Sequence, residues 1–286
     1  MAVKRKILQK TEQARCCVCN DKDYRVLKKV KFGNSSINLV KCKCGLIFFS
    51  PRLSRDYIKK LYSEDKLDQL SHNKAYAEED KIEFSQRLDI ARKHGKKGSV
   101  LDMGCSTGTF LLCCREKGYK QLYGVDINKK TNDYCINELK LDVGTTIPDR
   151  KFDLIHASDL IEHLQEPASF VKDAYQHLNN NGLLMMTTPN IRNPVNKLVN
   201  IKPKEHLYYF SRKTIRKLLE NNGFEVLLMK SRSRYHPLKH LANTSSADKV
   251  KGIVKLILAL KLDSVVNALI LKNLYLDLLV IARKKK

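Results

Sequence analysis

The sequence predicts an α/β fold built on a doubly wound, mostly parallel sheet. After Lys97, short apolar stretches alternate with helical patterns of about a dozen residues, which is typical of strands joined by crossover helices. A second observation predicts an additional small module, because four of the nine cysteines form two close pairs near the N-terminus. In a reducing compartment such pairs indicate a metal site rather than disulfides.

The order of these patterns divides the chain into six expected segments. They are a basic tail (1–13), a cysteine-containing module (14–52), a helical cap (53–96), the sheet domain (97–235), a basic and apolar helical insertion (236–273), and a last strand with a basic tail (274–286). Inside the cysteine module, strands are expected at 36–40 and 46–49. The cap is highly charged and nearly free of glycine and proline, which predicts helices.

The sheet domain contains the elements in alternation. Apolar stretches predict strands at 99–104, 121–128, 151–158, 182–190, 225–231 and 274–286. Helical spacing predicts helices at 109–119, 131–141, 160–178 and 212–224, and the run of asparagines before Gly182 is expected to end the third of them. The segment 140–154, around the third strand, is short, and the residue that would contact an adenine ring is not identified in it.

The charge is unevenly distributed along the chain. The net charge of +24 includes +15 over residues 191–286, whereas residues 99–190 carry −3. This pattern excludes a uniformly basic coating protein and indicates anionic partners for the flanks, unless it reflects only a lysine-rich composition. No apolar run approaches the roughly 18–20 residues of a membrane span. The N-terminus lacks the apolar stretch of a signal peptide, so we expect a cytoplasmic protein.

A glycine-containing turn follows the first strand of the sheet domain. Gly104 and Gly108 allow close approach of the backbone to a ligand, at the N-terminus of the next helix. Asp102 precedes the turn, where it would repel a phosphate but can accept from an ammonium group. Asp126 follows Gly108 by 18 residues, at the end of the next strand, where a carboxylate can bind both ribose hydroxyls. This combination favours S-adenosylmethionine over a dinucleotide, whereas a turn alone would be compatible with mere packing.

With these residues, the chain resembles the class I S-adenosylmethionine-dependent methyltransferases from about Val100 to Glu225. LDMGCSTG is similar to the family's first motif, with Ser106 where glycine is usual, and FDLIHASDLIEHLQEP is similar to its fourth strand and following segment. The resemblance implies a seven-stranded Rossmann-like sheet. It also implies a cofactor site formed by Asp102, Gly104, Cys105, Ser106, Gly108, Asp126, Ile127 and Ser158.

The cysteine pairs have the layout of a zinc ribbon. Cys16 and Cys19 are followed after 22 residues by Cys42 and Cys44, so that two turns could close a tetrahedral thiolate site around structural Zn²⁺. The chain also resembles a branch of the same family that has such a ribbon in front, although Cys-x-Cys replaces the common Cys-x-x-Cys. Reduced free thiols or a degenerate site are the alternative.

The candidate catalytic residues follow the fourth strand. Glu162 and His163 should face the methyl donor, and a histidine can take the proton of a substrate hydroxyl near neutral pH. Two alternatives remain open: Asp159 and Glu162 as a capping box, or Asp159, Glu162 and His163 as ligands of a divalent ion. His206 precedes two tyrosines on a later loop that is expected to cover the substrate, or to be merely packed.

Residues 249–273 are apolar on nearly every face and carry interspersed lysines. We expect this segment either to dock on anionic membrane or to be buried in the protein or in a dimer, and we leave the oligomeric state open. The expected function is methyl transfer to oxygen on a small molecule or a saccharide, which could be lipid-linked. The rivals are an RNA methyltransferase that uses the basic flanks and a non-catalytic cofactor-binding protein. Nucleic acid is the less favoured partner, because the fourth strand lacks the Pro-Pro-aromatic arrangement of base amino-group methylation.

Overall fold

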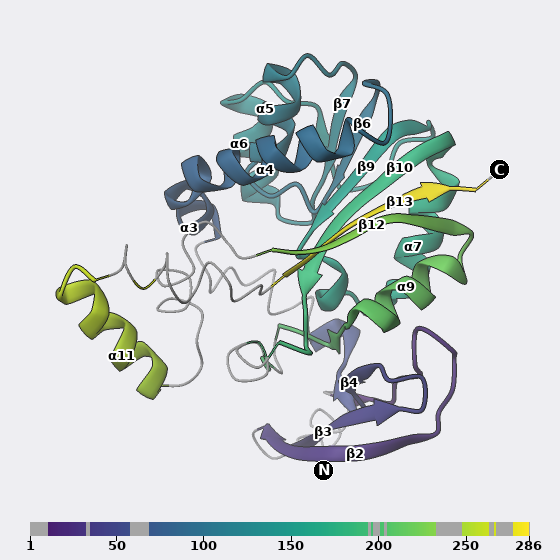
Figure 1. Ribbon diagram of the computed structural model, residues 1–286, viewed down its shortest axis with the longest axis vertical. Helices are drawn as coiled ribbons and strands as arrows, with labels where there is room; N and C mark the ends of the chain where they lie inside the picture. Colours follow the sequence, from purple (N-terminus) through teal and green to yellow (C-terminus); the bar gives the residue numbers. More distant parts are fainter. Residues whose placement is uncertain are drawn as a thin grey trace, which may run out of the picture.

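A seven-stranded sheet forms the centre of the molecule (Figure 1). The computed structural model describes residues 11–32, 35–57, 69–193, 196, 201–202, 205–232, 248–262, 266 and 277–285. The strand order is β12 (Phe224–Arg232), β13 (Asp277–Lys284), β10 (Leu178–Pro189), β9 (Phe152–Ser158), β6 (Val100–Met103), β7 (Leu122–Val125) and β8 (Val143–Gly144). Only β13 runs antiparallel to its neighbours in this sheet. The predicted fold class is confirmed.

Helices cover both faces of this sheet. One face carries α4 (Ala77–Ala91), α5 (Thr109–Glu116) and α6 (Lys129–Asn137), and the other carries α7 (Pro167–Gln176) and α9 (Arg212–Glu220). Alternate strand residues separate the two cores: Ile155 packs with α7 and α9, whereas Leu154 packs with α4 and α5. This period of two is expected for strands buried on both faces.

The N-terminal module contains a four-stranded antiparallel sheet with an unexpected member. Its order is β11 (Tyr208–Tyr209), β4 (Ile47–Phe49), β3 (Ser35–Cys42) and β2 (Tyr24–Phe32). β1 (Thr11–Glu12) pairs separately with β5 (Arg52–Leu53). Because β11 comes from the late part of the chain, the module and the sheet domain share one hydrogen-bonded edge.

The prediction of one continuous helix over residues 160–178 is wrong. A short 3₁₀ turn, η1 (Ile161–His163), comes first, Leu164 is extended, and α7 begins only at Pro167. Proline fits the first turn of a helix because its missing N–H has no partner there, so Pro167 starts the helix rather than lying inside it. The asparagines before Gly182 do not end the helix either, because they belong to β10, which has a register shift between Leu178 and Leu183.

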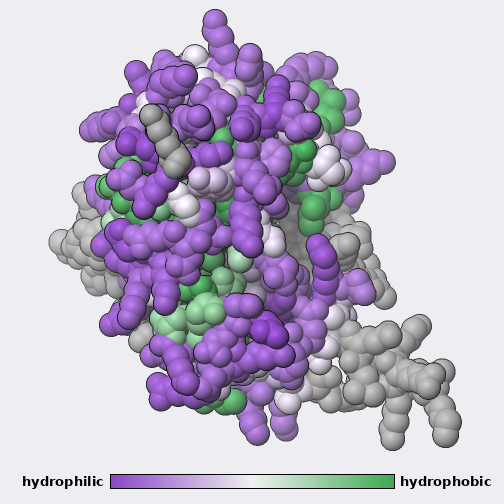
Figure 2. All heavy atoms as spheres, turned by 90° about the vertical axis from the view of Figure 1, so that its right-hand side faces the viewer, coloured by the Kyte–Doolittle hydropathy of each residue, from purple (hydrophilic) through white to green (hydrophobic). Residues whose placement is uncertain are grey.

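The described residues include parts of the expected helical cap and of the expected helical insertion. The cap contains α3 (Gln69–Ala75) and α4, while residues 58–68 lie outside the described part. The apolar segment 249–273 contains α11 (Asp248–Ala259), and most of its C-terminal part lies outside. No helix among the described residues is long and apolar enough to cross a membrane. The face shown in Figure 2 is mainly hydrophilic, with hydrophobic side chains in small areas.

Candidate active site

Four cysteine thiols come together in the N-terminal module, and we call Cys16, Cys19, Cys42 and Cys44 the thiol cluster. Their Sγ atoms all lie within 4.8 Å of one another. The distance is 3.4 Å for Cys16 to Cys44 and 3.4 Å for Cys19 to Cys42. Thiolates around a tetrahedral zinc ion at about 2.3 Å lie about 3.8 Å apart, so the cluster fits zinc. The short Cys-x-Cys spacing is compatible with this convergence.

Arg52 connects the N-terminal module to the sheet domain. Its buried guanidinium group donates from Nη1 to Tyr208 Oη at 2.6 Å and from Nε to Glu12 Oε1 at 2.8 Å. Tyr208 Oη donates in turn to the carbonyl oxygen of Gln165, at 3.2 Å. Tyr208 lies two residues after His206, so the module helps to fix the segment that carries a candidate catalytic residue.

The turn between β6 and α5 is held against the end of β7. The N–H groups of Gly104 and Cys105 both donate to the carbonyl oxygen of Val125, at 2.7 and 3.1 Å. Gly104 and Ser106 have φ angles of 78° and 48°, in the left-handed region that favours glycine. Ser106 thus adopts the backbone conformation of the glycine that is usual there.

Asp126 lies beside this turn, as predicted from its place at a strand end. Its carboxylate accepts from the N–H of Ser106 and from the N–H of Asn128, both at 2.9 Å. Two carboxylate oxygens offer about four acceptor positions, so lone pairs remain for the hydroxyl groups of a ribose. The next residue, Ile127, is 72% exposed, which is unusual for a large apolar side chain and leaves it available to cover an aromatic ring.

Asp102 and Cys105 both point away from the solvent. Asp102 Oδ1 is 2.7 Å from His156 Nδ1, and the His156 ring stacks on Phe110 with the ring centroids 3.6 Å apart. The Cys105 side chain is buried in the core under α4 and α5. In this arrangement Asp102 holds β6 to β9, and the thiol of Cys105 faces the core.

Glu162, His163 and His206 come together at the carboxyl ends of β9 and β10, and we call them the acid–base cluster. Each offers one ligand atom within 4.8 Å of the others. Glu162 and His163 come from η1 and His206 from the loop before β11. The rings of the two histidines meet edge to face, with centroids 4.7 Å apart. A hydrogen bond from the Leu207 N–H to the Glu162 carbonyl oxygen, 2.8 Å long, joins the two segments.

Hydrogen bonds orient the titratable groups of this cluster. His163 Nδ1 lies 2.8 Å from the carbonyl oxygen of Glu205; a carbonyl only accepts, so Nδ1 carries the hydrogen and Nε2 is left as the acceptor. Glu162 Oε2 accepts from Thr188 Oγ1 at 3.0 Å, and Oε1 has no partner among the described residues. Burial lowers the pKa of His163. Burial, and then the charge of Asp159, raise the pKa of Glu162 well above its usual range.

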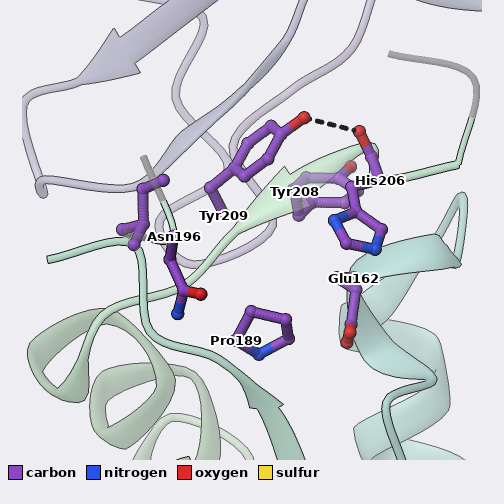
Figure 3. A pocket seen from close by; sticks show the side chains of 7 residues that line it. Glu162, Pro189, Asn196, His206, Tyr208 and Tyr209 are labelled. Atoms are coloured by element: carbon purple, nitrogen blue, oxygen red, sulfur yellow. Dashed lines mark hydrogen bonds between the residues drawn. The ribbon is translucent and has the colours of Figure 1, made fainter. Parts of the chain in front are cut away.

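The cavity beside this cluster is too small for a substrate. Glu162 and His206 line it with Pro189, Tyr208 and Tyr209 (Figure 3), and its volume is about 10 Å³. Such a volume holds about one water molecule. His206 and Glu162 are almost fully buried, whereas His163 is half-buried and is thus the most exposed member of the cluster.

The structure decides against one of the alternatives for these residues. No capping box is present, because Leu160 is the N-cap of η1 and makes no side-chain cap hydrogen bond. Asp159 Oδ1 instead accepts from Thr187 Oγ1 at 3.2 Å. A divalent ion remains geometrically possible, with His206 in the place that the sequence suggested for Asp159.

Comparison with known proteins now identifies the family. The model of a methyltransferase domain family matches residues 74–228, more than half of the chain. The chain belongs to this family. It is a class I S-adenosylmethionine-dependent methyltransferase, and hence an enzyme, with a zinc-ribbon-like module in front. No curated protein matches its sequence.

Solved structures show the same fold at low sequence identity. A methyltransferase from Archaeoglobus fulgidus is 24% identical, over 71% of this chain and 94% of that one, with a TM-score of 0.51. A methyltransferase from Clostridium acetobutylicum is 12% identical, over 81% and 100%, with a TM-score of 0.50. The [4+2]-cyclase SpnF is 19% identical, over 70% and 80%, with a TM-score of 0.51. A shared fold therefore leaves the reaction to be argued from the site.

The cofactor of this methyltransferase family fits the turn after β6. A Cβ on Gly104 would lie 3.2 Å from the Leu160 side chain, and the φ of Gly104 is positive, so this position of the turn favours glycine. Asp126 retains acceptor positions for ribose hydroxyls, and the exposed Ile127 lies next to it. Ser158 lies at the end of β9 and bonds Thr187 Oγ1 at 2.8 Å.

Several residues of the site could not be found from the sequence. Asn73 on α3 donates to Ser106 Oγ at 2.5 Å, which places the cap over the cofactor turn. Arg87 on α4 donates to Ser158 Oγ at 2.8 Å. Both lie in a charged segment that reads as an ordinary solvated helix. His156 was the one visible signal, as a histidine inside an otherwise apolar strand.

Proposed function

We propose that this methyltransferase methylates a hydroxyl oxygen of a small molecule or saccharide, with His163 as the general base. The observation that supports this is the neutral imidazole of His163, whose Nδ1–H is fixed by the Glu205 carbonyl oxygen and whose Nε2 is free to accept a proton. A group with that pKa is unprotonated near neutral pH, as a base must be. The saccharide class rests on the resemblance to the ribbon-bearing branch of the family.

The residues of the site would divide the work. When bound, S-adenosylmethionine would supply a methyl group on a sulfonium, and the electrons of the broken carbon–sulfur bond would stay on the sulfur. The β6 turn and Asp126 would hold this donor in one orientation, and positioning of the two reactants contributes most of such an acceleration. His163 Nε2 accepts the proton that the acceptor hydroxyl loses. Burial and the charge of Asp159 raise the pKa of the neighbouring Glu162, which favours its neutral form.

We also propose that the thiol cluster holds one structural Zn²⁺. All four donors are thiols at tetrahedral spacing, and a closed site of this type leaves no position for a substrate. The ion would fix the end of β3 to the loop between β1 and β2, and through β4 and β11 the segment of His206.

The donor site is tested with S-adenosylhomocysteine. We expect it to bind the full chain and to raise the Tm. Asp126→Ala should weaken binding by about ten- to a hundredfold, as expected when a charged hydrogen-bond acceptor is lost. Asp133→Ala, an exposed aspartate on α6, is the matched control. Calorimetry without any binding to the unmodified chain would contradict the donor site. Assays with radiolabelled methyl donor and hydroxyl acceptors of defined classes then test the acceptor.

A second proposal concerns α11 as a membrane-contacting helix. Ile253 and Leu256 are each 60% exposed and Leu260 is 59% exposed, and α11 lies apart from both sheets in Figure 1. Lys255 and Lys261 are exposed beside them, which favours an anionic surface. We expect co-sedimentation with anionic but not neutral vesicles, reduced at high salt. Leu256→Gln with Leu260→Gln should abolish it, and sedimentation that is unchanged in this variant would refute the contact.

A further inference from the structure

Arg87 is a buried cation that the proposed chemistry does not use. It lies on α4 and is 5% exposed. Nη2 donates to Glu83 Oε2 at 2.6 Å and Nη1 donates to Ser158 Oγ at 2.8 Å. Nε is buried without a hydrogen-bond partner among the described residues. A guanidinium group has five N–H donors in a fixed plane, and an unpaired one in the interior is costly.

Arg232, at the end of β12, lies next to it. Arg232 Nη2 donates to Oε1 of Gln86, the neighbour of Arg87 in α4, at 3.1 Å. Its Nη1 is also buried and without a partner in the described part of the chain. Burial, followed by the positive charge of Arg87, lowers the pKa of Arg232. The two guanidinium groups are therefore close enough to repel each other.

Two carboxylates face this arginine pair, Arg87 and Arg232. Glu83 is bonded to Arg87, and the buried Asp277 lies opposite Arg232 in the register of β12 and β13. The pair is therefore not a bare positive cluster. What it lacks is acceptors for Arg87 Nε and Arg232 Nη1. Planar oxyanions such as carboxylate, and phosphate likewise, offer several acceptors to such donors.

The pair reaches from the outer strand β12 to the predicted donor site. Asp126 and the glycine turn belong to β6 and β7, whereas Arg232 ends β12, which is four strands from β6 in the sheet order. At about 4.8 Å between neighbouring strands, this distance is about 19 Å along the sheet edge. Arg87 reaches Ser158 at the end of β9, five residues before His163. The pair therefore begins beside Ser158 and extends towards the β12 edge of the sheet.

We propose that Arg87 and Arg232 bind an anionic oxygen group, phosphate or carboxylate, on the methyl acceptor. This proposal rests on the proposed function, and it narrows the acceptor to hydroxyl compounds that carry such a group. Glu83 would orient Arg87, and its negative charge would weaken the binding of the anion.

Calorimetric titration of the full chain tests the pair, with S-adenosylhomocysteine present and inorganic phosphate or acetate as the probe. We expect one of the two anions to bind, and the stronger one identifies the group. Arg232→Gln should weaken that binding at least about tenfold, as the loss of a charge-assisted hydrogen bond predicts. The matched control is Arg212→Gln, an exposed arginine that donates to Ser231 Oγ beside Arg232.

A second variant keeps the test independent of folding. Glu83→Gln removes an opposing charge and should strengthen anion binding several-fold, which a purely structural role of Glu83 would not do. No anion binding by a chain that binds S-adenosylhomocysteine would refute the arginine pair and leave the methyltransferase proposal intact. If Arg232→Gln weakened S-adenosylhomocysteine binding as much as anion binding, the pair would belong to the donor site and the proposal would be wrong.

Discussion

The thiol cluster and the acid–base cluster are equally tight, yet they differ in what surrounds them. In both, the donor atoms lie within 4.8 Å of one another. In the thiol cluster, the free thiol of Cys16 contacts that of Cys44, and the free thiol of Cys19 contacts that of Cys42. In the acid–base cluster, His163 is instead bonded to a backbone carbonyl oxygen and Glu162 to Thr188.

This difference separates a structural site from a reactive one. Four thiols that converge on one point suit one ion and no substrate. In the acid–base cluster, hydrogen bonds fix Glu162 and His163, and the pKa values of these two groups are shifted in opposite directions, up for the acid and down for the base. Opposite shifts in neighbouring groups are typical of acid–base chemistry. Closeness of metal-ligating residue types therefore does not by itself indicate a metal.

The largest effect is expected from the thiol cluster. Cys16→Ser, or removal of metal with a strong chelator, should unfold the N-terminal module, because structural zinc sites contribute on the order of 10 kcal/mol to folding. Elemental analysis should give one zinc per chain, and the Tm should fall when it is removed. Cys17→Ser is the control, since Cys17 is outside the cluster. A reduced, zinc-free chain with an unchanged Tm would contradict the comparison.

The second effect concerns His163. His163→Gln should lower kcat by about 10²- to 10⁴-fold, the usual contribution of a general base, while S-adenosylhomocysteine binding stays unchanged. His177→Gln is the control, because His177 Nδ1 also lies 2.8 Å from a backbone carbonyl oxygen, that of Asp173. In the unmodified chain, activity should fall only below the ordinary histidine pKa, since burial lowers the pKa of His163. If activity already began to fall above pH 7 as the pH was lowered, His163 would be ruled out as this base.

The smallest effect is a pH-dependent change in stability. The pKa of Glu162 is raised in the folded protein, so the folded state retains a proton that the unfolded chain releases. Stability is then lost as the pH rises through the raised value. Glu162→Gln cannot ionise, and the Tm of the variant relative to the unmodified chain should increase from pH 5.5 to 8.5. Glu116→Gln, at an exposed glutamate, should show no such trend, and a flat difference for Glu162→Gln would disprove the shift.

The sheet and the cofactor turn were predictable because they depend on local patterns. The alternation of apolar runs fixes the strands, and the two glycines with Asp126 mark the turn and the neighbouring strand end. The four cysteines were also found from spacing alone, and the structure brings all four together. The convergence of Glu162, His163 and His206 followed only in part, since the sequence placed two of them together and left the third on a separate loop.

Long-range contacts were not predictable. Nothing in the charged cap indicates that Arg87 is buried, because its environment is created by strands more than sixty residues later, such as that of Ser158, 71 residues away. Pro167 was read inside a helix, although it begins one, because periodicity does not show where a helix starts. The bond from Asp102 to His156, which is 54 residues further along the chain, also has no signal in the sequence, and the expected ligand contact of Asp102 stays a prediction.

The pairing of β11 with β4 has a consequence for the order in which the chain folds during synthesis. The N-terminal module leaves the ribosome before the sheet domain does, but its sheet is completed by Tyr208, which also bonds Arg52 across 156 residues. Until then β4 is paired only with β3, and its other edge could pair with another chain. The opposite edge, β2, is protected by Lys28, Lys29 and Lys31. The free edge of this sheet therefore stays open until Tyr208, 160 residues after its partner Phe48, has been made.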